Sequence, residues 1–206
     1  EYFSKAVELD PNYALGYAGL ADAYSLLVYY DYMSETEASP KAKDAALRAL
    51  KIDNTIAEAH ASLGWIKTNA WDWEGAEQEF KRAIELNPGY AIAHHWRSML
   101  FIFLARYDEA IEEIEMALEL DPYSPVINRD VGMVYLFAGR YDQAIEALKK
   151  AIELEANIRW VHSYLGFAYC FNSMYPEALA EFKGNSYWEH FVYARMGEKQ
   201  KARQWL

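Results

Sequence analysis

The sequence predicts an all-α protein, built as a solenoid of antiparallel helix pairs. Two columns of alanines carry this prediction, because each recurs with a fixed step of 34 residues. A period of this length is typical of a solenoid in which one supersecondary unit is stacked many times. The first column consists of Ala42, Ala76, Ala110, Ala144 and Ala178, and the second of Ala49, Ala83, Ala117 and Ala151.

A single period, taken over residues 87–121, shows why each unit should contain two helices. Pro88 precedes a helix predicted over residues 91–105, residues 106–108 form a turn, and a second helix is predicted over residues 109–120. Asp121-Pro122 ends the second helix, because proline disfavours helical geometry at the residue before it. Apolar residues in the second helix follow the i, i+4, i+7, i+8 spacing of an amphipathic helix.

The period sets the limits of the units along the chain. We expect a single array over residues 1–206, and because the chain opens partway through a helix pattern, we expect it to be a piece of a longer protein. The units are the end of a partial repeat (1–13), a repeat with a nine-residue insertion (14–56), four further repeats (57–90, 91–124, 125–158 and 159–183), and a partial or truncated terminal repeat (184–206).

Two segments depart from the period. The insertion falls between Val28 and Pro40, and we interpret it as an overlong first helix followed by a loop, with Pro40 opening the second helix. Near the C-terminus Ala202 lies only 24 residues after Ala178. Two interpretations stay open here: a shortened helix hairpin, or residues missing from the sequence near 183–187.

Several periods repeat a motif of a large residue followed by glycine, then alanine, a large residue and a second alanine. It appears as Leu63-Gly64, Ala76, Phe80, Ala83 and Pro88, as Val131-Gly132, Tyr135, Ala144, Leu148 and Ala151, and as Leu165-Gly166, Tyr169, Ala178 and Phe182. These residues resemble the tetratricopeptide repeat (TPR) family over nearly the whole chain. The resemblance implies a right-handed superhelix of antiparallel helix pairs, concave on the side of the first helices, that binds other proteins.

A narrower resemblance rests on the insertion together with residues 71–76 and the run His94-His95-Trp96. It is similar to TPR regions appended to bacterial winged-helix regulators, adenylate cyclase-like proteins and serine/threonine kinases. This resemblance implies a role in regulation within a larger protein.

Composition excludes several classes of partner. The chain has 31 acidic and 20 basic residues and a formal net charge of −11, which argues against nucleic acid because a phosphate-binding surface needs clustered Lys and Arg. The apolar runs are too short and too often broken by charge to predict a membrane span. The single cysteine, Cys170, excludes an intrachain disulfide and fits a reducing compartment, so we expect a cytoplasmic protein.

No pattern in the sequence predicts catalysis, a cofactor or a metal site. His60, His94 and His162 share one phase of the repeat, so we interpret them as packing residues and not as metal ligands. Glycine-rich phosphate loops, serine elbows and metal-ligand helix motifs do not occur. Trp71 and Trp73 fall at a turn between helices, where we expect both to pack.

The candidate binding site is an apolar and aromatic groove on the first helices. The helix stripe opposite each repeat's own core should be solvated, yet it carries large apolar residues at spacings of three, four and seven. A peptide-carboxylate clamp needs Lys, Asn and Arg at these positions, and only Arg129 could serve. We therefore expect a protein or peptide partner that docks an amphipathic or hydrophobic segment. The groove residues are Trp65, His95, Trp96, Met99, Phe103, Arg129, Met133, Phe137, Trp160, Tyr164, Phe167 and Phe171.

Two alternatives to a partner-binding groove stay open. In the first, neighbouring first helices or a terminal helix cover the groove residues. In the second, the array acts by self-association, as a homo-oligomer, or by sensing a signal for an attached effector domain.

Overall fold

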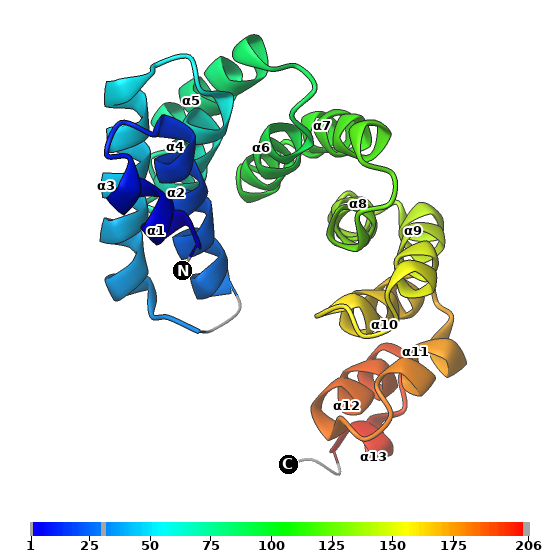
Figure 1. Ribbon diagram of the computed structural model, residues 1–206. Coiled ribbons are helices and arrows are strands. Elements are labelled where there is room, and N and C mark those ends of the chain that lie inside the picture. The colour runs from blue at the N-terminus through cyan, green and yellow to red at the C-terminus, as the bar shows by residue number, and fades with distance from the viewer. Residues whose placement is uncertain (1, 30–31, 204–206) are drawn as a thin grey trace. The chain divides into compact units, whose positions relative to one another are not determined.

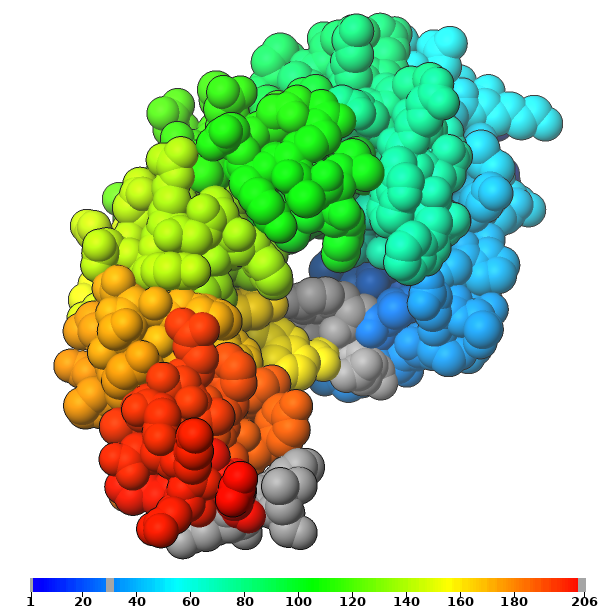
Figure 2. All heavy atoms as spheres, turned by 180° about the vertical axis from the view of Figure 1, so that it is seen from behind, coloured from blue at the N-terminus to red at the C-terminus, as the bar shows by residue number. Residues whose placement is uncertain are grey.

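The computed structural model describes residues 2–29 and 32–203 (Figure 1). Two compact units, Glu1–Leu104 and Ala105–Leu206, divide the chain. Throughout the described residues the ordered elements are helices, which confirms the all-α class. Within each unit consecutive helices pack as pairs, and the gradual change of colour along each unit in Figure 2 reflects this stacking in chain order.

The N-terminal unit is built on two antiparallel pairs, α2 with α3 and α4 with α5, and these pairs also pack against each other through α2, α3 and α4. Its helices are α1 (Tyr2–Leu9), α2 (Ala14–Tyr29), α3 (Glu35–Ile52), α4 (Ala57–Asn69), α5 (Trp73–Leu86) and α6 (Ala91–Phe103).

The C-terminal unit is built on the pairs α8 with α9 and α10 with α11, with α7 packed on α8 and α12 on α11. Its helices are α7 (Tyr107–Leu120), α8 (Pro125–Phe137), α9 (Tyr141–Leu154), α10 (Val161–Phe171), α11 (Tyr175–Glu181), α12 (Ser186–Arg195) and α13 (Lys199–Ala202).

The small residues of the repeat lie where the helices of a pair cross. Every alanine of the two columns is buried, with at most 1% of its surface exposed. A Cβ added to Gly64 would lie 2.8 Å from the Phe80 ring, and one added to Gly166 would lie 2.6 Å from the Phe182 ring. Helix pairs therefore approach as closely as they do because these positions carry almost no side chain.

The turns between paired helices share one backbone geometry. The second residue after the end of each first helix adopts a left-handed conformation, with φ of 63° at Trp71, 55° at Ala105, 74° at Gly139 and 63° at Ser173. These four positions are 34 residues apart. The next backbone N–H donates to a carbonyl five residues back, for example from Arg140 to the Tyr135 oxygen at 2.8 Å, which is the Schellman pattern of a helix C-terminus.

The expectation that Pro40 opens the second helix of the inserted repeat is wrong. Helix α3 begins at Glu35 and contains Pro40 within it. Compared with α4 and α5, three inserted residues lengthen α2, two lengthen the connection and four lengthen α3. Glu35 and Glu37 lie near the positive end of the helix, and Ala38 is fully buried, so the extra turn offsets the one hydrogen bond that Pro40 cannot donate.

At the C-terminal end the last helix pair is short. Helix α11 has 7 residues where α9 has 14, and the chain turns at Gly184, with φ of 86°, to enter α12 directly. The Asn185 N–H donates to the Phe182 carbonyl at 2.8 Å and closes this turn.

Candidate partner-binding surface

In the N-terminal unit the groove residues lie at different depths. His95 and Met99 of α6 are buried. Trp65 of α4 and Trp96 of α6 are half-buried and stack on each other, with ring centroids 5.8 Å apart. This stack lies against the core formed around Phe80. At these positions neighbouring first helices therefore pack on each other instead of leaving an open groove.

Phe103, in the last turn of α6, remains on the surface with 59% of its area exposed. Its ring lies 6.2 Å from that of Trp73, which in turn lies 5.2 Å from Trp71. Trp71 is 77% exposed, so the expectation that it packs in the turn is wrong. Trp71 has a left-handed backbone with φ of 63°, and its ring meets that of Trp73 edge to face.

In the C-terminal unit two groove residues are largely accessible. Phe137 is 52% exposed and Trp160 is 50% exposed, while Met133 and Tyr164 are half-buried. The Arg159 guanidinium lies 5.1 Å above the Trp160 ring, a cation–π distance. These side chains present apolar and aromatic surface to solvent.

Arg129, in contrast, is buried with Asp130 in a bidentate ion pair. The Arg129 Nε donates to Asp130 Oδ1 at 2.7 Å, and Nη2 donates to Oδ2 at 2.8 Å. The remaining Nη1 donates to the Arg159 carbonyl at 3.3 Å. The guanidinium is therefore occupied in holding α8 to the start of the next pair, and a peptide carboxylate would have to displace these contacts.

Phe167 and Phe171 of α10 are partly covered by the terminal helix α12. The Phe167 ring lies 4.7 Å from Trp188 and 6.0 Å from Phe191, and Phe171 lies 6.1 Å from Phe191. The edge-to-face geometry of these pairs is the favourable one for aromatic rings. At these two positions the terminal helix occupies part of the groove.

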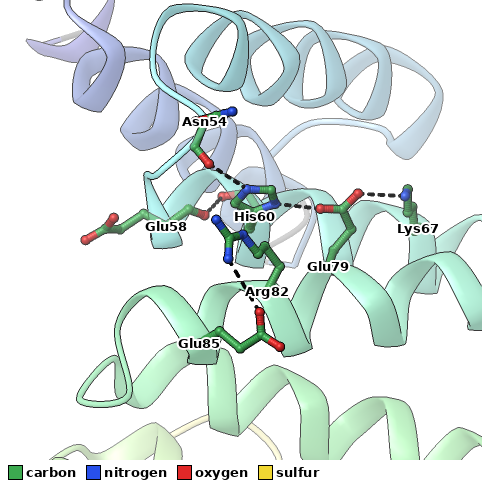
Figure 3. A network of polar contacts seen from close by, with 8 residues as sticks. Asn54, Glu58, His60, Lys67, Glu79, Arg82 and Glu85 are labelled. Atoms are coloured by element: carbon green, nitrogen blue, oxygen red, sulfur yellow. Dashed lines mark hydrogen bonds and ion pairs between the residues drawn. The ribbon is translucent and has the colours of Figure 1, made fainter.

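The histidines of the repeat tie each first helix to its surroundings. His60 Nδ1 lies 2.7 Å from Glu79 of α5, and its Nε2 lies 3.2 Å from the Asn54 carbonyl in the preceding turn (Figure 3). His162 makes the same two contacts, to Glu181 at 2.7 Å and to the Ala156 carbonyl at 3.2 Å. This recurrence supports a structural role.

The Glu79 carboxylate also accepts from Lys67 at 2.8 Å, so it bridges two residues of α4. Burial acts to raise the pKa of Glu79, but hydrogen bonds from His60 and Lys67 outweigh it and the pKa is lowered. The carboxylate therefore remains charged at neutral pH and fixes α5 against α4.

The one cysteine of the chain is held in a poorly nucleophilic form. Cys170 is buried and burial raises the pKa of its thiol, with Arg195 opposing, so the unreactive thiol form prevails. Within residues 2–29 and 32–203, no three His, Cys, Asp or Glu side chains are placed to hold a metal ion. None of the described helices is both long enough and apolar enough to cross a membrane.

One half-buried acid, Asp22, has no counterpart in the sequence patterns. Asp22 of α2 accepts a hydrogen bond from Ser62 of α4, and Tyr90 lies near enough to feel the charge of both Asp22 and Glu58. Burial raises the pKa of Asp22 to about 6, with the Ser62 hydrogen bond opposing and Glu58 adding to the shift. No sequence signal marks this position, because an acid on a solvent face has the same local pattern.

Comparison with known proteins supports the repeat assignment. Residues 91–124 match a family profile described as tetratricopeptide repeat, and residues 132–170 match one described as TPR repeat. No curated protein sequence matches the chain at a significant level.

Solved structures share the fold. PilF of Pseudomonas aeruginosa is 21% identical, with 91% of this chain and 89% of that chain covered and a TM-score of 0.67. YrrB, described as a TPR protein with an unusual peptide-binding site, is 18% identical, with 97% and 98% covered and a TM-score of 0.61. A tetratricopeptide repeat protein from Parabacteroides merdae is 16% identical, with 97% and 80% covered and a TM-score of 0.63.

At such identities the structural likeness speaks for the fold alone. The 34-residue period, the paired helices and the two profile matches agree with one another. Together they identify tetratricopeptide repeats in this chain, over residues 91–124 and 132–170.

Proposed function

We propose that this chain is a non-catalytic protein-interaction module that docks an amphipathic or hydrophobic segment of a partner protein on its first helices. The observation that carries the proposal is the exposure of Phe137 and Trp160 in the C-terminal unit, which are 52% and 50% exposed. Large aromatic residues supply most of the binding energy in many protein interfaces. The peptide-binding site named for YrrB adds support by analogy.

The core of the repeat does not require these side chains. The buried core is formed by the alanine columns and by residues such as Phe80, Leu148 and Leu165. Exposed apolar residues mark an interaction site where they form a contiguous patch, and the proposal takes these side chains to form part of one. A nucleic-acid partner is disfavoured by the net charge of −11.

A peptide-display selection against the chain tests the proposal. We expect the selected peptides to carry apolar residues at helical spacing, and Trp160→Ala to weaken their binding by about tenfold or more, since interface anchors contribute about 2 kcal/mol. Tyr123→Ala is the matched control, because Tyr123 is an aromatic residue that is 80% exposed and is not one of the groove residues. Equal affinity of the Trp160→Ala and wild-type chains would contradict the proposal.

The rival function, self-association or signal sensing for an attached effector domain, uses the same exposed surface. Light scattering over a range of concentrations distinguishes the two functions: a mass that rises with concentration and falls on Trp160→Ala supports self-association.

The proposed context is a larger regulatory protein in the cytoplasm, supported by the insertion, the Trp71–Ala76 segment and the single cysteine. The sequence of the full gene product tests that context.

A further inference from the structure

The insertion in the first full repeat borders a pocket of about 200 Å³ within the N-terminal unit. Its walls come from the last turns of α2, the first turns of α3 and the C-terminal half of α4. Glu35 belongs to the four-residue turn that the insertion adds to α3. The regular repeats of the chain lack this added turn, so the pocket is a feature of the inserted repeat.

The lining combines aromatic rings with a carboxylate. Tyr24 and Trp65 contribute rings, Glu35 contributes an acid, and Ser39 and Asn69 contribute neutral polar groups. An aromatic face beside a carboxylate is the chemistry that recognises an organic cation. An anion would meet both the Glu35 charge and the net negative charge of the chain.

Two acids near the start of α3 differ in their surroundings. The Glu37 carboxylate holds Lys41 at 2.9 Å, whereas the Glu35 side chain lines the pocket. The Lys41 ammonium lies 5.8 Å from the centre of the Tyr24 ring, and its pairing with Glu37 offsets the repulsion that it would exert on a cation in the pocket.

The volume sets the size of the ligand. Pockets for whole small-molecule ligands measure about 300–1,000 Å³. A space of about 200 Å³ lies below that range, so it suits the end of a side chain better than a whole small-molecule ligand.

We propose that this pocket binds the cationic end of an arginine or lysine side chain of a partner protein, between the aromatic walls and the Glu35 carboxylate. The inference rests on the proposed function in one respect only, that a protein supplies the cation. The carboxylate lies at an exposed position, so it steers and orients the cation, while the rings supply the contact area.

The test uses the full 206-residue chain and two probes of the same shape, N-acetyl-arginine methylamide and its neutral isostere N-acetyl-citrulline methylamide. Binding is followed through the indole N–H resonance of Trp65 in the ¹⁵N-labelled chain. We expect a saturable shift with the arginine probe, a markedly smaller one with citrulline, and weaker arginine binding in high salt. The lysine analogue should bind as the arginine probe does.

Glu35→Gln should weaken binding of the arginine probe about three- to fivefold, as for exposed charge pairs in general. Asp44→Asn, on the same helix but paired to Arg48 and outside the pocket lining, should leave it within about twofold. Equal shifts with arginine and citrulline would overturn the proposal, and so would unchanged binding in Glu35→Gln. These probes require no partner protein, so their result is independent of the peptide selection that tests the proposed function.

Discussion

At the residue scale, the four turn positions show how one backbone geometry accepts different side chains. Trp71, Ala105, Gly139 and Ser173 all adopt a positive φ between 55° and 74°. Glycine adopts this conformation without strain, whereas other residues incur a cost of about 1–2 kcal/mol. The period predicts where the turn falls, but it does not predict that a tryptophan there stays exposed.

Exchanging residues at the turn position should change stability in opposite directions. We expect Gly139→Ala to lower the free energy of unfolding by about 1 kcal/mol, because only backbone strain is added: the nearest outside atom to a new Cβ, the Tyr141 hydroxyl, is 3.9 Å away. Ser173→Gly should raise it by about 0.5–1 kcal/mol, since it relieves the same strain. Urea denaturation of both variants checks this, and effects of the same sign would contradict it.

The half-buried acid Asp22 gives the N-terminal unit a defined pH dependence. The pKa of Asp22 is raised from 3.8 to about 6 on folding, so the folded state favours the protonated acid. The contribution of Asp22 to the free energy of unfolding is therefore complete below pH 3.8 and is lost as the pH rises through 6. Asp22→Asn should therefore raise the free energy of unfolding at pH 8 by about 1–3 kcal/mol and change it little at pH 4. Urea denaturation at both values measures the difference, with Glu8→Gln on the exposed face of α1 as control. An equal effect at pH 4 and pH 8 would contradict this account.

At the element scale, the helix pairs follow from the sequence because their signals are local and repeated. Small residues, amphipathic stripes and turn positions recur in each period, so errors at helix ends stay within a few residues: α6 ends at Phe103 and α7 begins at Tyr107, against predicted limits of 105 and 109. The insertion is harder to predict, because proline usually marks a helix start and here lies inside α3. Burial of Ala38, a tertiary effect, decides that outcome.

Closeness of paired helices can be tested at Gly132 in α8. A Cβ there would overlap the Leu148 side chain of α9 and approach the Ala144 carbonyl to 3.2 Å, so Gly132→Ala should cost about 1–3 kcal/mol despite its gain in helix propensity. Gly89→Ala is the control, because the nearest atom to its new Cβ is Asn87 Oδ1 at 3.5 Å. Thermal unfolding of the two variants should separate them clearly, and similar melting temperatures would refute the close-contact argument.

At the scale of the whole molecule, stability should be distributed along the stack, because each pair contacts mainly its neighbours. Phe182 is buried against Gly166 and Trp188, and Phe182→Ala should cost about 3–5 kcal/mol. Hydrogen exchange should then increase in α10, α11 and α12 and stay unchanged in α2, α3 and α4. Uniform loss of protection over both units would show a single cooperative unit instead.

The sequence predicts the candidate surface less completely than it predicts the fold. Helical spacing predicts that all the groove residues lie on first helices, whereas Trp160 lies in the turn just before α10 with a φ of 68°. Spacing also does not say which groove residues a neighbour covers. Trp65 and Trp96 stack together and α12 packs on Phe167 and Phe171, contacts between elements that no single period encodes. Arg129 likewise has the residue type of an anion ligand, and only the folded chain pairs it with Asp130.

The central claim, that apolar aromatic surface on the first helices docks a partner segment, is tested most directly by the heat capacity change of binding. Isothermal titration calorimetry of a display-selected peptide at several temperatures should give a clearly negative heat capacity change, the robust marker of apolar burial. Its magnitude should fall in Phe137→Ala and Trp160→Ala and stay the same in Tyr123→Ala. A heat capacity change near zero, or one that these two substitutions leave intact, would contradict the claim.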